Sequence, residues 1–144
     1  MDVKVLGKLT KDQAEVALKW FATMRSEPEI QKIQEWWYTE LPKVKTYEEF
    51  NTRYPVGSTG WYYFQTWYRY AEIIGELVYQ GLVPVEFVLD ALGGVGFNDT
   101  VKMILEGRRK EGPYNALVAE NWEWLYKQIL KYRDEAIKQS RRYK

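Results

Sequence analysis

Four glutamates lie in two segments that we expect to be helical: Glu72 with Glu76, and Glu120 with Glu123. Residues three or four positions apart share one face of an α-helix, so each pair would present two carboxylates in the same direction. Carboxylate oxygens are ligands that Mg²⁺ uses in proteins. If the two helices faced each other, these side chains could hold Mg²⁺ for metal-assisted hydrolysis.

The spacing of the glutamates only partly fits that chemistry. All-α nucleotide pyrophosphohydrolases typically carry two Glu-x-x-Glu/Asp sets on adjacent helices; here Glu120 and Glu123 have this spacing, whereas Glu72 and Glu76 are four apart. Charged residues at helical spacing more often form a solvated face. We therefore expect no catalytic residue, no metal site and no cofactor, and we keep a Mg²⁺-dependent nucleotide hydrolase as the alternative.

Composition excludes the chemistry that needs a cysteine or a histidine. The chain has no cysteine and no histidine. Thiol nucleophiles, disulfides, zinc knuckles and Ser-His triads are therefore absent.

A glycine-rich segment, residues 93–96 (Gly-Gly-Val-Gly), precedes a helix expected to begin near Asp99. Such a loop before a helix N-terminus can cradle phosphate. The Gly-Lys-Ser/Thr of a phosphate loop is missing, however, and an acid at the helix start repels anions. We expect a helix stop followed by a flexible turn.

Adjacent aromatic residues favour an interaction surface. Trp36 and Trp37 are neighbours, as are Trp122 and Trp124 across Glu123, so each pair points to different sides of its helix. At least one ring of each pair should be partly exposed unless the bundle wraps both, and exposed Trp and Tyr favour protein interfaces or a membrane surface. The candidate interaction residues are Trp36, Trp37, Trp124, Arg108, Arg109 and Lys110.

The residues "GWYYFQTWYRY" (60–70) begin the helix that should organise the fold, which we place at 60–81. Its polar positions fall on one narrow stripe: Gln65, Arg69, Glu72, Glu76 and Gln80. The remaining surface is largely apolar, so we expect a central helix with buried rings and a solvent-facing stripe; the alternative is a stripe that lines a pocket. Gly75 costs about 1 kcal/mol relative to Ala in mid-helix, which close approach of another helix or a bulky ring would offset.

Capping signals indicate the other helices. Capping boxes begin at Thr10, Ser26 and Thr46, Asn98 or Asp99 should cap a helix that ends near Gly107, and Pro113 should open the last helix. A further helix is expected over 85–92. The last helix carries an apolar seam that should pack on the central helix: Val118, Trp122, Leu125, Ile129, Tyr132 and Ala136. The fold class is thus all-α, a compact bundle of about six helices without strands.

Length and charge indicate one domain over 1–144, with a flexible extension at 1–8 and a flexible basic tail at 138–144. The 21 basic and 20 acidic residues nearly cancel, which gives no strong signal for nucleic-acid binding. Charges within 61–83 argue against a membrane span, and the N-terminus lacks signal-peptide character. We expect a cytoplasmic protein, and the Lys-, Glu- and Tyr-rich mix suggests a thermophile.

Residues from about 64 to 125 resemble a family of all-helical domains of unknown function, often the soluble part of membrane-anchored bacterial and archaeal proteins. The resemblance lies in "WYRYAEIIGELVYQGLV", "PVEFVLDALGG", "VKMILEGRRK" and "ENWEWLY". It implies a helical domain and supplies no catalytic residues. No anchoring segment is evident here, so membrane tethering is not expected.

These observations predict a non-enzymatic protein-interaction or scaffold domain, with a protein partner or a second copy of the chain as its ligand. The second alternative, after the hydrolase, is peripheral binding to membranes or nucleic acid through the aromatic residues and the basic residues at 108–110 and in the tail.

Overall fold

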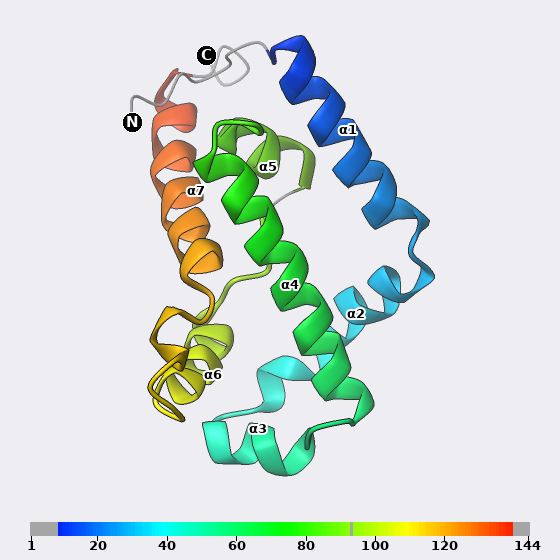
Figure 1. Ribbon diagram of the computed structural model, residues 1–144, viewed down its shortest axis with the longest axis vertical. Helices are drawn as coiled ribbons and strands as arrows, with labels where there is room; N and C mark the ends of the chain where they lie inside the picture. Colours follow the sequence, from blue (N-terminus) through cyan, green and yellow to red (C-terminus); the bar gives the residue numbers. More distant parts are fainter. Residues whose placement is uncertain (1–8, 93, 140–144) are drawn as a thin grey trace.

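The computed structural model describes residues 9–92 and 94–139, and in these ranges the chain is helical without strands (Figure 1). This confirms the predicted all-α bundle. The elements are α1 (Lys11–Ser26), α2 (Pro28–Thr39), the 3₁₀ turn η1 (Leu41–Lys43), α3 (Tyr47–Arg53), α4 (Thr59–Tyr79), α5 (Val85–Leu92), α6 (Asp99–Arg109), the 3₁₀ turn η2 (Asn115–Leu117) and α7 (Glu120–Gln139).

Helix α4 is the central element, as predicted. In Figure 1 it crosses the middle of the molecule, with α7 along one side and α1 on the other. Its contact with α7 is the most extensive between any two elements in the described ranges. Four residues of the predicted seam on α7 are buried there: Trp122, Leu125, Ile129 and Tyr132. The side chain of Ala136 lies outside the described residues.

Most helix ends follow the predicted local signals. Thr10 forms the full capping box with Gln13, and Asn98 accepts a hydrogen bond from the backbone N–H of Val101 at 2.9 Å. After α4, Gly81 has φ +76°, and the N–H of Leu82 donates to the carbonyl of Leu77 at 2.9 Å. This is the left-handed glycine stop expected there.

Two predicted helix starts are wrong. Ser26 does not cap α2 but ends α1, and Glu27 is extended because a residue before proline is disfavoured in the helical region. The chain therefore forms two helices at this point. Pro113 does not open the last helix, since η2 intervenes and Ala119, at φ +60°, separates it from α7.

The flexible extension and the flexible tail stay predictions. Residues 1–8 and 140–144 lie outside the described residues. Lys138 and Gln139, expected in the flexible tail, belong to α7, and Lys138 lies 3.7 Å from Glu135. None of the described helices has the length and apolar character needed to cross a membrane.

The adjacent tryptophans of α2 are both buried, so the alternative applies in which the bundle wraps both rings. Trp36 is 8% exposed and packs edge-on against Tyr54 at 5.1 Å between ring centres. Trp37 is 2% exposed and stacks on Phe64 at 5.4 Å. The bundle encloses both rings because the segment from α3 to α4 covers one while α4 covers the other.

The aromatic stretch at the start of α4 is less deeply buried than expected. Phe64 is fully buried, whereas Tyr62 is 56% exposed. The other five rings of the stretch are half-buried and most of them pack against the core. Of their hydroxyl groups, that of Tyr68 accepts a hydrogen bond from the Ala119 N–H at 3.4 Å.

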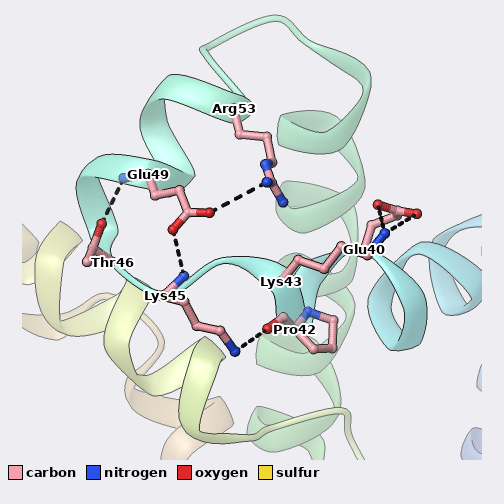
Figure 2. A network of polar contacts seen from close by, with 7 residues as sticks. All are labelled: Glu40, Pro42, Lys43, Lys45, Thr46, Glu49 and Arg53. Atoms are coloured by element: carbon pink, nitrogen blue, oxygen red, sulfur yellow. Dashed lines mark hydrogen bonds and ion pairs between the residues drawn. The ribbon is translucent and has the colours of Figure 1, made fainter.

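A polar network fixes the connection from α2 to α3 (Figure 2). Glu49 accepts a hydrogen bond from the Lys45 N–H at 3.0 Å, while its own N–H donates to the Thr46 hydroxyl at 3.0 Å. Arg53 lies 3.6 Å from the Glu49 carboxylate, and the Lys45 ammonium donates to the carbonyl of Pro42 at 3.1 Å. This network sets the start of α3, which carries Tyr47 and Asn51.

Candidate functional site: the Arg108 pocket

The Glu72 carboxylate has a structural role. Its Oε1 accepts a hydrogen bond from the backbone N–H of Trp122 at 2.8 Å, and the N–H of Asn121 also donates to this carboxylate. Residue Ala119 precedes α7 and has no side-chain acceptor, so Glu72 caps α7 from α4. Burial raises the pKa of Glu72, against the two backbone hydrogen bonds, which lower it.

The other three glutamates do not join Glu72 in a metal site. Glu76 accepts hydrogen bonds from Gln80 at 2.9 Å and from Asn121 at 3.2 Å. Glu123 pairs with Arg109 at 3.1 Å, and Glu120 is exposed. Throughout residues 9–92 and 94–139, acidic side chains form no group of three suited to a metal ion. Within the described residues, the four glutamates are therefore not gathered as the hydrolase alternative predicts.

The polar stripe of α4 divides between solvent and neighbouring helices. Arg69, Glu76 and Gln80 are exposed, as expected for a solvent-facing edge. Gln65 and Glu72 are half-buried, and they accept hydrogen bonds from α6 and α7 respectively. The stripe is thus partly a polar seam between helices.

The glycine segment is held by tryptophan side chains. The indole N–H groups of Trp67 and Trp122 both donate to the carbonyl of Val95, at 3.0 and 2.9 Å. The indole of Trp37 donates to the carbonyl of Gly96 at 2.7 Å. A phosphate cradle needs backbone N–H donors, whereas this loop directs two carbonyls at the core. Gly93 lies outside the described residues.

The basic residues 108–110 have three different environments. The Arg109 guanidinium donates to the carbonyl of Val118 at 2.9 Å and pairs with Glu123. Lys110 is exposed. Arg108 is half-buried and packs over the ring of Phe64, 4.7 Å from its centre. These residues do not form the continuous basic surface that nucleic-acid or membrane binding requires.

Arg108 lies in an open pocket of about 610 Å³ between α3, α4, α6 and the segment that contains η2, which we name the Arg108 pocket. Its aromatic walls are Tyr47, Trp61 and Tyr68, and its polar walls include Asn51 and Asn115. The Arg108 guanidinium donates to the side-chain oxygen of Gln65. In the described part of the chain no carboxylate forms an ion pair with Arg108.

The one carboxylate in the lining is engaged by a tyrosine. The Tyr47 hydroxyl donates to Glu111 at 2.5 Å. Burial raises the pKa of Tyr47, and this hydrogen bond adds to the rise. Burial lowers the pKa of Arg108, but a guanidinium stays charged in proteins. The pocket therefore offers a partly desolvated cation that can donate to an incoming anion.

The predicted interaction residues are not brought together. Arg108 enters the pocket, Arg109 stabilises the segment before α7, and Trp36 and Trp37 are buried. Trp124 is half-buried on α7, with its ring 5.5 Å from the ring of Tyr79. The aromatic walls of the pocket were not identified from the sequence, because their contact with Arg108 depends on long-range packing.

Comparisons with family models, curated proteins and solved structures find no match. The resemblance to a helical domain family stays a prediction.

Proposed function

We propose that this protein is a non-enzymatic interaction domain and that its Arg108 pocket binds an acidic side chain of a partner protein, flanked by apolar residues. The observation that carries the proposal is Arg108: a half-buried guanidinium without an ion pair in the described residues, at the wall of an open pocket. An incoming carboxylate would accept hydrogen bonds in which donor and acceptor are both charged, whereas Gln65 offers Arg108 a neutral oxygen.

The surroundings of Arg108 support a protein as the ligand. The pocket combines Arg, Tyr and Trp, the residue types enriched at the centres of protein interfaces. Val56 lines it and is 82% exposed. The segment that contributes Asn115 also carries Tyr114 and Leu117, which are 94% and 69% exposed. A partner carboxylate could pair with Arg108 while its apolar neighbours pack on these exposed side chains; the Glu111 carboxylate of the same lining is engaged by Tyr47.

Selection from a random peptide display library tests this proposal. Peptides selected on the wild-type chain should carry Asp or Glu next to aromatic or aliphatic residues. The same selection on Arg108→Met, which keeps the length of the side chain without its charge, should lose the acidic position. For one selected peptide, Arg108→Met should weaken binding roughly 10- to 100-fold, because the lost hydrogen bonds involve two charged groups.

Lys110→Ala is the matched control, since it removes a neighbouring exposed cation. It should keep both the acidic preference and most of the affinity. Arg108→Lys retains the charge without the planar fork and should have intermediate affinity. Acidic peptides that bind Arg108→Met as well as wild type, or selected peptides without acidic residues, would contradict the proposal.

A more specific form of the interaction proposal is self-association, in which the partner is a second copy of this chain. The outer end of α7, where Ile137 is 59% exposed, is the surface at which we expect a second copy to bind. Light scattering coupled to gel filtration tests it directly. A mass of 17.2 kDa at high protein concentration would exclude a homodimer and leave the Arg108 pocket unaffected.

A further inference from the structure

We propose that Tyr47 is a positioning residue of the Arg108 pocket: its hydroxyl holds the Glu111 carboxylate away from Arg108 and so leaves Arg108 available to the carboxylate of a partner. This inference rests on the proposed function of the pocket. It adds an internal competitor for the partner, Glu111, and the side chain that restrains this competitor. Both residues line the pocket together with Arg108.

Glu111 is the acidic residue that the sequence places next to Arg108. The two residues are three positions apart, and the N–H of Glu111 donates to the carbonyl of Arg108 at 3.1 Å in the turn that ends α6. Opposite charges at this spacing are neighbours on a helix surface and attract each other. Burial lowers the pKa of Arg108, and Glu111 lies near enough for its charge to oppose this lowering. The structure nevertheless shows no ion pair between these two described residues.

The Tyr47 hydroxyl engages Glu111 instead. It donates to Oε1 of Glu111 at 2.5 Å, a distance typical of a hydroxyl bound to a charged acceptor. Burial and this hydrogen bond raise the pKa of Tyr47. A hydrogen bond from Asn51 and the charge of Arg108 oppose the rise, so both of these side chains lie near the same hydroxyl. The hydroxyl therefore has the carboxylate as its acceptor and the cation as its neighbour.

Two helices fix the position of this hydroxyl. Gly107 lies within α6, and a Cβ at this position would overlap the ring of Tyr47. Glycine disfavours a helix relative to alanine, but here it leaves room for the ring to pack on the backbone of α6. The start of α3, which carries Tyr47, is fixed in turn by the hydrogen bonds of Thr46 and Glu49 (Figure 2).

A crystal structure of Tyr47→Phe tests the positioning role without any ligand. Phenylalanine keeps the ring that packs on Gly107 and removes only the hydroxyl, so we expect the fold to be retained. Without that donor, Glu111 should turn towards Arg108 and place a carboxylate oxygen within about 4 Å of its guanidinium. A Glu111 side chain that stays apart from Arg108 in this variant would overturn the proposal, whatever the pocket binds.

The affinity for one acidic peptide selected on the wild-type chain measures the consequence for binding. Tyr47→Phe should weaken binding roughly fivefold, because the peptide carboxylate then competes with an ion pair within the chain. In the Glu111→Gln background, the same substitution should change the affinity by less than about twofold, because no competing carboxylate remains. An unchanged affinity of Tyr47→Phe, or an equal loss in the Glu111→Gln background, would overturn the proposal.

Glu106→Gln is the matched control for the loss of an acidic side chain. Glu106 is exposed on α6, two positions before Arg108 and therefore on another face of the helix, and it does not line the pocket. Tyr47→Phe should still weaken binding about fivefold in the Glu106→Gln background. If wild type and Arg108→Met bound acidic peptides equally, the proposed function would fail, while the structure of Tyr47→Phe would still decide the role of Tyr47.

Discussion

Gly96 is a backbone position that two tryptophan side chains constrain. Its φ of +69° is in the left-handed region, and its carbonyl accepts from Trp37. A Cβ at this position would lie 2.7 Å from the Trp67 indole nitrogen and 3.1 Å from that of Trp37. The residue is therefore constrained by conformation and by space at once.

Gly96→Ala should destabilise the fold more than its backbone strain explains. We expect the free energy of unfolding in urea to fall by about 3 kcal/mol, from left-handed strain plus displaced indoles. Gly57→Ala is the control, because Gly57 has φ +92° but no atom within 4 Å of its would-be Cβ. It should lose only about 1 kcal/mol. Equal losses of stability in Gly96→Ala and Gly57→Ala would show that the indoles of Trp37 and Trp67 move aside at no cost.

Glu72 should make stability depend on pH. Its pKa is raised above the ordinary 4.5 mainly by burial, so the folded state holds a proton that the unfolded chain has already released. The contribution of Glu72 to stability is therefore present below pH 4.5 and is lost as pH rises through the folded-state pKa.

Urea unfolding of wild type and Glu72→Gln between pH 4 and 7 measures this effect. The glutamine keeps one oxygen for the N–H groups of α7 and does not titrate. The stability of wild type relative to Glu72→Gln should fall as pH increases. If the stability of wild type relative to Glu72→Gln increased with pH, the raised pKa of Glu72 would be contradicted.

At the scale of elements, Gly75 sets how closely α4 and α7 approach. A Cβ at Gly75 would lie 2.6 Å from the backbone oxygen of Asn121. This is the close approach that the mid-helix glycine predicted. The same contact places the first turn of α7 where Glu72 can cap it.

Gly75→Ala should therefore destabilise, although alanine favours a helix over glycine by about 1 kcal/mol. Backbone atoms of Asn121 cannot move aside as a flexible side chain would, so we expect a net loss of about 1–3 kcal/mol in thermal or urea unfolding. Arg69→Ala, exposed on the same helix, should change stability by less than about 0.5 kcal/mol. A more stable Gly75→Ala protein would mean that α7 can shift away from α4.

Local signals explain which parts of the fold were predictable. Thr10 caps a residue three positions away, and the Gly81 stop involves residues within one turn, so both are readable in sequence. The contacts that build the candidate site are distant: Glu72 to Trp122 spans 50 positions, and Arg108 to Gln65 spans 43. The apolar pattern placed α4 at the centre, but it could not specify which polar side chain would meet which partner.

At the scale of the whole molecule, α1 is held less firmly than α4 and α7. Its buried side chains are Ala17 and Met24, whereas Leu18 is 64% exposed. It lies apart from α7 on the other side of α4 (Figure 1), and its Gln13 side chain donates to the carbonyl of Gly81 at 3.1 Å. It also carries Trp20, which is half-buried and packs against the core.

Native-state hydrogen exchange should reveal this difference. Regions with few buried apolar side chains open at lower free energy than the core. Amides of α1 should therefore exchange through an opening at least about 2 kcal/mol below the global unfolding that limits α4 and α7. Protection of α1 equal to that of α7 would show that the whole bundle unfolds as one cooperative unit.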